Sequence, residues 1–253
     1  MTALIDSDSL IYKVGFAIEE KTTWNEVEVE LYGEEPITEI TTNIDQCYET
    51  LDKMIDNIRF AAEADDVLLV FTGSNNFRYD NPLGYKQHRT DLRKPLGYLD
   101  MLTYLLAKYP HKVAEGMEAD DVVVYLKKTQ PNDYCLCAID KDVLYQTPGL
   151  HYNYGKDEYV TISKQKAKLF EYYQCLIGDT SDGYKGCPGI GPKKAKAILK
   201  EATTELEMWE AVVKAYESKG LTEEDAINTM RLCSMHQYNG EVIELWSPDN
   251  IDG

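Results

Sequence analysis

Eight carboxylates fall in four short clusters, each placed where a strand is expected to end or a helix to begin. The clusters are Asp6; Glu118, Asp120 and Asp121; Asp140 and Asp142; and Asp179 and Asp182. Like charges at short range cost free energy, so a cluster with no obvious arginine partner inside it predicts a bound cation. Oxygen-only ligands favour a hard ion, Mg²⁺ or Mn²⁺. The clusters therefore predict metal-dependent phosphate chemistry.

Short strands alternate with helices over the first 160 residues. Strands are expected at 3–6, 67–71, 111–114 and 134–139, and helices from about Ile44, over 96–108 and from Glu118. The continuous apolar run at 67–71 is typical of a strand buried on both faces of a parallel sheet. This pattern predicts an α/β fold with a mainly parallel central sheet flanked by helices. In such folds sites form beyond the carboxyl ends of the strands, where Asp6 and Asp140 lie.

Other segments divide the chain further. Residues 22–42 predict a hairpin, because Val27, Val29 and Leu31 alternate and Gly33 can form the turn. Residues 73–95 are polar, aromatic and basic without a clear period, which favours a functional loop. Helices are expected up to Ile177, from Pro192, over 203–217 and over 222–235. We therefore expect a metal-binding core over 1–160, with a substrate loop at 73–95, and a helical lobe over 161–253.

The net charge of −18 by itself favours an acidic protein that does not bind nucleic acid. The distribution of charge decides binding, however, rather than its sum. No acid lies between Asp182 and Glu201, where the chain has Lys185, Lys193, Lys194, Lys196 and Lys200. A second basic stretch has only Asp80 and Asp91 as acids beside Arg78, Lys86, His88, Arg89, Arg93 and Lys94. Two basic patches around an acidic centre fit a phosphodiester substrate.

The first of these basic patches contains a separate signal, the turn GCPGIGPKKA at 186–195. Closely spaced glycines let the backbone approach a ligand, and the start of a helix at Pro192 offers free N–H groups to phosphate. The lysines that follow add a salt-dependent attraction to a duplex backbone. A glycine-rich connector between two helices is the alternative interpretation.

Membrane and secretory classes are not favoured. The chain has no run of about 18 apolar residues, and its first residues lack the basic and apolar regions of a signal peptide. Its six cysteines include no C-x-x-C pair, which argues against a zinc site and suits a reducing cytoplasm.

Each acidic cluster also has an ordinary explanation. Glu118 and Asp121 can favour a helix N-terminus through the helix dipole, and Asp140 with Asp142 can form a solvated turn. Asp179 and Asp182 can cap their own backbone in a turn, and Asp6 can be an ordinary acid at a strand end. Their joint occurrence, in this order on an α/β frame, favours the metal site.

Five stretches resemble the 5′-nuclease superfamily in order and spacing: LIDSDSLIY, GYKQHR, EGMEADDVV, CAIDKDV and IGDTSDGYKGCPGIGPKKA. This superfamily includes flap endonucleases, the 5′-exonuclease domain of bacterial DNA polymerase I and phage 5′-exonucleases. The stretches FTGSNNFR and KPLGY and the end of the chain look most similar to the 5′-to-3′ exonucleases of T7-like phages. The resemblance covers nearly the whole chain.

The resemblance implies a mechanism with two Mg²⁺ or Mn²⁺ ions in a nuclease that acts on DNA, in the host cytoplasm if a phage encodes it. It implies first-metal ligands at Asp6, Glu118 and Asp120, second-metal ligands at Asp140, Asp142, Asp179 and Asp182, and a supporting catalytic acid at Asp121. Lys86 and Arg89 match basic residues that contact the scissile phosphate. The segment 189–196 matches a helix–two-turn–helix element that grips duplex DNA and often holds K⁺. The implied DNA-binding residues are Tyr85, Arg93, Lys94, Gly189, Gly191, Lys193, Lys194 and Lys196.

One position departs from the family. An aspartate usually follows the strand at 67–71, where this chain has Thr72, Gly73 and Ser74. Asp8, two residues beyond Asp6 on the same strand face, is a candidate substitute. Three hypotheses follow. The favoured one is a 5′-to-3′ nuclease acting on DNA ends, flaps or RNA–DNA hybrids in phage replication or primer removal. The others are a non-catalytic DNA-structure-binding homologue with an impaired first metal site, and a PIN-like ribonuclease, which would not need the glycine–lysine turn.

Overall fold

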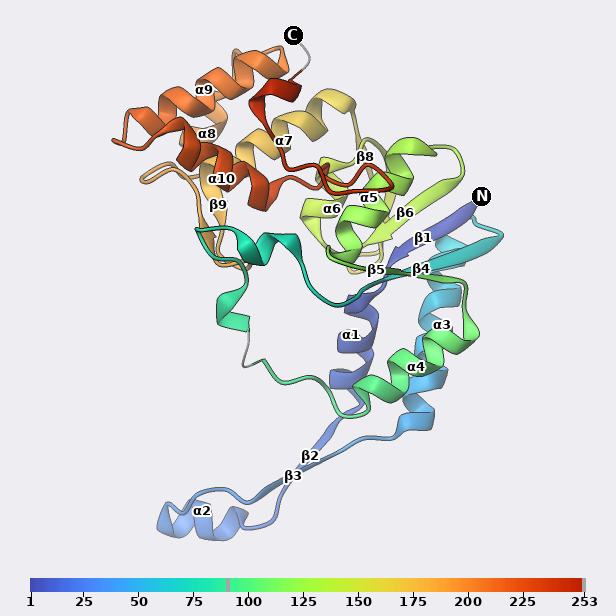
Figure 1. Ribbon diagram of the computed structural model, residues 1–253. Coiled ribbons are helices and arrows are strands. Elements are labelled where there is room, and N and C mark those ends of the chain that lie inside the picture. The colour runs from blue at the N-terminus through green and yellow to red at the C-terminus, as the bar shows by residue number, and fades with distance from the viewer. Residues whose placement is uncertain (90–91, 252–253) are drawn as a thin grey trace.

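The computed structural model describes residues 1–89 and 92–251, and its centre is one six-stranded sheet (Figure 1). Its strands are β1 (Thr2–Asp6), β4 (Asp66–Thr72), β5 (His111–Ala114), β6 (Tyr134–Ala138), β7 (Gly149–Asn153) and β8 (Glu158–Ile162). They follow the order β5-β4-β1-β6-β7-β8, and every pairing is parallel except that of β7 with β8. The predicted mainly parallel α/β fold is confirmed.

Helices cover both faces of this sheet. On one face α1 (Asp8–Ile18), α3 (Ile44–Ala61) and α4 (Tyr98–Lys108) pack on Ile5, Leu69 and Phe71. On the other face α5 (Ala119–Thr129) and α6 (Lys141–Gln146) pack on Leu4 and Val70. Neighbouring side chains of a strand point to opposite faces, so a strand covered twice must be apolar throughout. This double cover explains the unbroken apolar run at 67–71.

A second group of helices has its own apolar cluster, built on Tyr172, Val212, Tyr216 and Met230. These helices are α7 (Lys164–Ile177), α8 (Pro192–Ile198), α9 (Glu205–Glu217) and α10 (Glu223–Cys233). Ser163, Thr204 and Thr222 cap three of them by accepting hydrogen bonds from backbone N–H groups three residues later. A short ribbon of β9 (Gly178–Asp179) and β10 (Tyr184–Lys185) connects α7 to the glycine-rich turn.

The chain end does not stay with these helices. After α10, Met235 packs into the cluster under α5, and Tyr238 and Ile243 pack against it. The last short helix is η3 (Pro248–Asn250). The predicted domain boundary near residue 160 stays a prediction. The C-terminal segment packs on the helix that covers the sheet, α5, and not only on the second group of helices. Among the described residues, no helix is long and apolar enough to span a membrane.

The predicted hairpin at 22–42 exists, but its centre is different. β2 (Glu20–Thr23) pairs antiparallel with β3 (Thr38–Thr41). Val27, Val29 and Leu31 lie in a helix, α2 (Glu26–Tyr32), so the predicted strand alternation there is wrong. The intervening glutamates are good helix formers, and Gly33 ends the helix with a left-handed φ of 67°. Neither β7 nor β8 was predicted.

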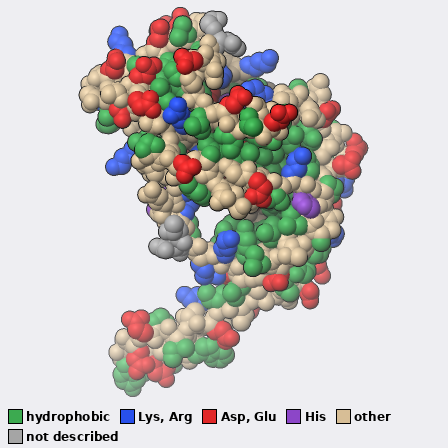
Figure 2. Space-filling view, in the orientation of Figure 1, with side chains coloured by type: hydrophobic (Ala, Val, Ile, Leu, Met, Phe, Trp, Pro, Cys, Tyr) green, Lys and Arg blue, Asp and Glu red, His purple; other side chains and the backbone are tan. Residues whose placement is uncertain are grey.

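The segment 73–95 leaves β4, and its described residues form two short 3₁₀ helices, η1 (Phe77–Asp80) and η2 (Gln87–Arg89). Residues 90 and 91 of this predicted loop, including Asp91, lie outside the described residues. Figure 1 shows the described part running from β4 to the helical group and then back towards α4. On the face seen in Figure 2, the molecule is hollowed beside this segment.

Leu51→Ala tests the core under α3. Leu51 is fully buried, and truncating a buried leucine leaves a cavity, so we expect a loss of about 2–5 kcal/mol in the free energy of unfolding. Phe60, on the same helix, is 82% exposed, and Phe60→Ala should change stability by less than about 0.5 kcal/mol. Urea unfolding, monitored by circular dichroism, measures the free energy of unfolding of both variants. Equal losses in the two variants would contradict this packing.

Candidate active site

The carboxyl ends of three neighbouring strands form the floor of the site. Asp6 ends β1, Thr72 ends β4 on one side, and Asp140 follows β6 on the other. Helix α5 begins above them, with Glu118 as its N-cap and Asp120 in its first turn. The chain first adds β4 and β5 on one side of β1 and then adds β6 on the other side, so this edge is a topological switch point, where α/β proteins commonly bind ligands.

Negative charge accumulates at this edge. Burial, together with Asp8, Asp140 and Glu118, raises the pKa of the Asp6 carboxyl well above its usual range. Burial and the charges of Asp6, Glu118 and Asp140 do the same to the pKa of Asp120. In the described ranges Asp6, Asp120 and Asp140 form no salt bridge, unlike the other acids of the clusters. These three carboxylates are therefore the part of the site that most needs a cation.

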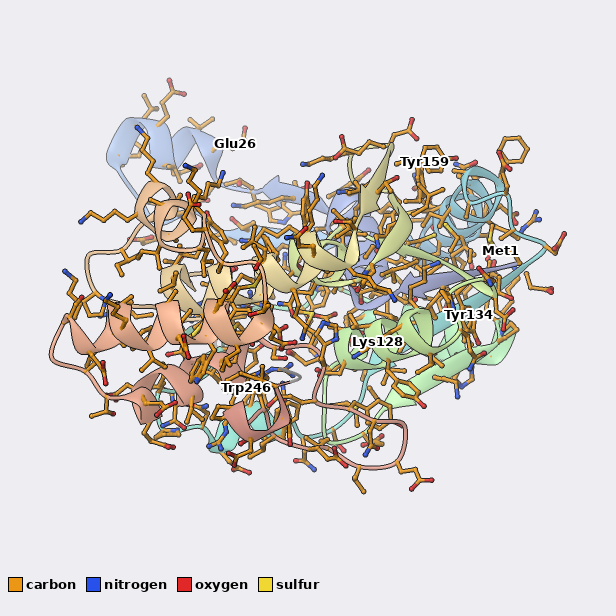
Figure 3. The ribbon with its side chains drawn as sticks, turned by 90° about the horizontal axis from the view of Figure 1, so that it is seen from above. Met1, Glu26, Lys128, Tyr134, Tyr159 and Trp246 are labelled. Atoms are coloured by element: carbon orange, nitrogen blue, oxygen red, sulfur yellow. The ribbon has the colours of Figure 1, made fainter. Side chains whose placement is uncertain are left out.

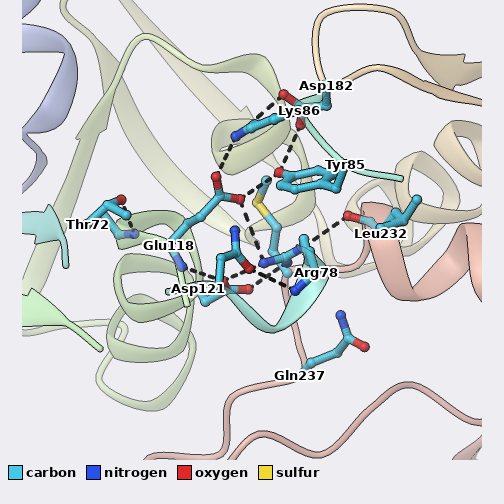
Figure 4. Close-up of polar contacts among 12 residues, drawn as sticks. Thr72, Arg78, Tyr85, Lys86, Glu118, Asp121, Asp182, Leu232 and Gln237 are labelled. Carbon is cyan, nitrogen blue, oxygen red and sulfur yellow. Dashed lines mark hydrogen bonds and ion pairs between the residues drawn. The ribbon is translucent and has the colours of Figure 1, made fainter. Parts of the chain in front are cut away.

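Glu118 has its own counter-charge (Figure 4). Its carboxylate accepts hydrogen bonds from Lys86 Nζ at 2.5 Å and from the Tyr85 hydroxyl at 2.6 Å. Burial would lower the pKa of Lys86, but Glu118 and Asp182 raise it above the usual value, so Lys86 stays charged. Lys86 also has a left-handed φ of 50°, an uncommon conformation for a non-glycine residue and one that clusters at functional sites.

The ribbon of β9 and β10, with its connecting turn, brings a second pair of acids to the site, Asp179 and Asp182. Asp182 lies 3.5 Å from Lys86 Nζ and 3.1 Å from an Arg89 guanidinium nitrogen. Asp179 pairs with Lys141 at 3.1 Å. Figure 4 shows Asp182 and Glu118 on either side of the Lys86 ammonium group. The loop residues Lys86 and Arg89 are thus docked onto this ribbon.

Asp142 has an unsatisfied buried oxygen. Its Oδ1 atom is buried without a hydrogen-bond partner, and the nearest ammonium group, that of Lys141, lies 3.9 Å away. Burial, and then the charge of Asp140, raise the pKa of Asp142 to about 7. An orphaned buried oxygen costs free energy unless a ligand satisfies it.

Asp121 has an arginine partner from outside its own cluster in the sequence. Arg78, 43 residues earlier, donates to both Asp121 oxygens at 2.7 and 2.8 Å, and both side chains are buried. Arg78 also donates to the backbone carbonyls of Leu232 and Ser234 at the end of α10. The Asp121 carboxylate completes the capping box of α5 by accepting from Glu118 N–H. Asp121 therefore holds Arg78 and the helix start, and is not open to substrate.

Thr72 replaces the expected acid with different contacts. Its Oγ1 accepts a hydrogen bond from Ala119 N–H at the start of α5. Its own N–H donates to the Asp8 carboxylate, with both oxygens at 3.2 Å. Asp8 is also the carboxylate that raises the pKa of Asp6 most. Asp8 is the first residue of α1, so its predicted place on the strand face is wrong, but it lies near Asp6 and at the end of β4, where the acid is missing.

The remaining predicted contacts divide into exposed and buried residues. Gly189, Gly191 and the three lysines of α8 lie at the surface, with Lys194 Nζ 2.9 Å from the Gly189 carbonyl. The exposed lysines are Lys193, Lys194 and Lys196. Arg93 pairs with Glu19, and Lys94 Nζ lies 4.1 Å from the Tyr98 ring centre. Tyr85, predicted to contact DNA, is only 4% exposed and donates to Glu118, so that prediction is corrected.

Two partners were missed from the sequence, Arg78 for Asp121 and Lys141 for Asp179. The only signal for Arg78 was its place in the basic stretch, and none linked it to one acid. Among the described residues, no three Asp, Glu, His or Cys side chains already stand as a metal-binding group. Lys86, Arg89 and Lys141 instead form ion pairs with acids of the site.

Comparison with known proteins finds similar sequences among phage nucleases. No protein-family model matches the chain. It is 26% identical to the exodeoxyribonuclease of Enterobacteria phage T3 over 236 residues, which covers 87% of this chain and 72% of the relative. It is 24% identical to the exonuclease of Escherichia phage T7 over an alignment of 294 residues, covering 97% and 93%. The resemblance to the 5′-nucleases is confirmed.

A solved 5′-nuclease structure has the same fold. The flap endonuclease of bacteriophage T5, in a complex with DNA and metal ions, superposes with a TM-score of 0.68 at 15% identity. The match covers 94% of this chain and 90% of the T5 chain. At this identity the likeness establishes the fold, while the roles of individual residues rest on the site geometry above.

Arg78→Ala tests the buried ion pair. Removing the guanidinium leaves Asp121 buried and uncompensated, so we expect a loss of about 3–5 kcal/mol in the free energy of unfolding. Arg59→Ala removes a surface arginine 3.6 Å from Asp56 and should cost less than about 1 kcal/mol. The double variant Arg78→Met/Asp121→Leu should lose less stability than Arg78→Ala, because no charge stays buried. Urea unfolding measures all three, and a double variant at least as unstable as Arg78→Ala would contradict the pairing.

Proposed function

We propose that this protein is a divalent-metal-dependent 5′-to-3′ exonuclease and structure-specific 5′ flap endonuclease that hydrolyses DNA phosphodiester bonds. The observation that carries this proposal is the convergence of Asp6, Asp120 and Asp140, which form no salt bridge within the described part of the chain, at the switch point of the sheet. The similarity to the T3 and T7 phage nucleases supports the reaction class and a role in phage replication or primer removal.

The residues present fit two hard divalent ions. Asp6, Glu118 and Asp120, with Asp8 in place of the acid missing at Thr72, would hold the first ion. Asp140, Asp142, Asp179 and Asp182 would hold the second, and the orphaned Asp142 oxygen supports this. All these ligands are carboxylate oxygens, which suits Mg²⁺ or Mn²⁺. To bind an ion, Glu118 and Asp182 would have to give up their ion pairs with Lys86, and the metal ion would take the place of the ammonium group.

Bound divalent ions would activate a water and stabilise the leaving oxygen of an in-line displacement. The protein supplies the remaining contacts. When Lys86 leaves Glu118, its ammonium group can neutralise charge that develops on the scissile phosphate. Arg89, on the same loop and half-buried, is placed to act beside it. Arg78 and Asp121 keep the start of α5, and hence Glu118 and Asp120, fixed while Lys86 moves.

The exposed start of α8 is proposed as the grip on duplex DNA. Its lysines face solvent without an acid nearby in sequence, and the glycines at 189 and 191 leave room for a phosphate backbone. This surface distinguishes the proposal from a PIN-like ribonuclease, which would not need it. The K⁺ ion expected at this turn stays a prediction; the Gly189 carbonyl there accepts from Lys194.

Cleavage of a 5′-labelled duplex and a 5′-flap duplex in Mg²⁺, Mn²⁺ or EDTA tests the reaction. We expect metal-dependent release of short 5′ products by the wild-type protein. Asp140→Ala should abolish cleavage and leave DNA binding largely intact, because it removes a metal ligand and no DNA contact. Asp133→Ala, at the opposite end of β6 from Asp140, is the matched control and should cleave normally. Binding without products in either metal would instead support the non-catalytic homologue.

Lys193→Ala/Lys194→Ala tests the duplex grip. Each lost phosphate contact reduces the slope of log K against log salt by about 0.9, so the double variant should flatten it by about 1.8. Binding should weaken for all sequences alike. Lys164→Ala/Lys166→Ala removes the same charge from the exposed start of α7 and should leave the slope unchanged. A sequence-selective loss, or an equal change in the control, would count against this surface.

A further inference from the structure

Residues 20–41 form an arm that the proposed reaction does not use. It consists of β2, α2 and β3, and it projects from the body of the molecule below α1 in Figure 1. Figure 3 shows Glu26, at the start of α2, at the outer edge of the molecule and far from Met1 at the start of β1. The arm therefore presents its surface away from the sheet.

The arm is built as an ordered element. Its two strands pair over four residues, from Glu20 with Thr41 to Thr23 with Thr38. Asn25 joins the two sides of the tip: its side-chain oxygen accepts from Ile37 N–H at 2.7 Å, and its amide donates to the Glu35 carbonyl at 3.0 Å. At the base, Arg93 donates to both oxygens of Glu19 at 2.7 and 2.6 Å. These bonds fix the tip to the hairpin and the hairpin to the body.

The tip nevertheless exposes large apolar side chains. No residue of α2 is buried. Val27 and Leu31, four residues apart on one helix face, are 61% and 65% exposed. Trp24, Tyr32 and Ile37 around them are 67%, 76% and 63% exposed. A two-stranded hairpin is only marginally stable alone, so this apolar surface gains most by burial against a partner.

The charge of the arm restricts what that partner can be. Between 20 and 41 the chain has seven glutamates and one lysine. Figure 2 shows the acidic side chains at the tip of the arm beside the apolar ones. A phosphate backbone would be repelled here, whereas a basic surface would be attracted. The same excess of glutamates opposes docking of the arm on the arm of a second copy.

We propose that the arm is a protein-docking element, whose apolar side chains Trp24, Val27 and Leu31 pack against an apolar surface flanked by lysine and arginine, such as an amphipathic helix, on another protein. The amphipathic helix α2 supplies the anchors, as in recognition between helices through their apolar faces. The glutamates steer the encounter and set the orientation. Because the arm lies apart from the acidic switch point, docking does not occupy the proposed catalytic residues.

Binding of a defined peptide to the full-length protein tests the docking face. The probe is a fluorescent 20-residue amphipathic helix with leucines along one face and lysines along the other. Its control has the same composition in an order that gives no apolar face. We expect anisotropy to show salt-sensitive binding of the probe and at least tenfold weaker binding of the control. Hydrogen exchange should show protection of residues 20–41 on binding.

Val27→Gln/Leu31→Gln removes the anchors and keeps good helix formers in α2. Probe binding should weaken at least tenfold. Val242→Gln/Leu245→Gln, at side chains that are 55% and 48% exposed elsewhere, is the matched control and should bind as wild type. Glu26→Gln/Glu30→Gln should flatten the salt dependence. Circular dichroism and urea unfolding check that each variant folds, so this test is independent of the proposed reaction.

Four outcomes would overturn the docking proposal. Equal binding of probe and scrambled peptide would mean that net charge alone attracts them. Equal loss in the Val27/Leu31 and Val242/Leu245 variants, or no protection of residues 20–41, would place the contact elsewhere. A concentration-dependent dimer that Val27→Gln/Leu31→Gln abolishes would show that a second copy occupies the arm.

Discussion

The buried pair of Arg78 and Asp121 joins the three segments on which the site depends. Arg78 belongs to the loop after β4, Asp121 to the first turn of α5, and the accepting carbonyls of Leu232 and Ser234 to the end of α10. A buried guanidinium is tolerated only when its donors are satisfied, so the Arg78 hydrogen bonds fix the three segments relative to one another. In this arrangement Tyr85 and Lys86, on the same loop as Arg78, contact Glu118.

The site is then a balance of charges of two kinds. Glu118, Asp179 and Asp182 have side-chain cations against them, while burial and the neighbouring carboxylates, Asp140 among them, raise the pKa of Asp6 and of Asp120. Carboxylates of the first kind can accept an ion by exchanging a lysine, and those of the second kind supply the attraction. Lys86, shared by Glu118 and Asp182, connects the acidic floor to the loop that the proposed substrate would pass.

The acidic net charge is compatible with a nucleic-acid substrate because the charges are separated in space. Seven glutamates lie on the projecting arm, whereas the start of α8 carries lysines alone. Repulsion from exposed charges is screened within about 10 Å at moderate salt, so the distant arm has little effect on the proposed DNA surface. Its acids and apolar side chains are instead suited to a protein.

The sequence by itself determined the parallel strands β1, β4, β5 and β6, most helices and the positions of the acidic clusters. These depend on local patterns: the apolar run of β4 reflects burial on two faces, and Ser163, Thr204 and Thr222 cap the helices that follow them. Only the tertiary structure decided which cation meets which acid and that Tyr85 is buried. Pairings such as Arg78 with Asp121 join residues far apart in the chain, and their energies depend on burial, which no local pattern specifies.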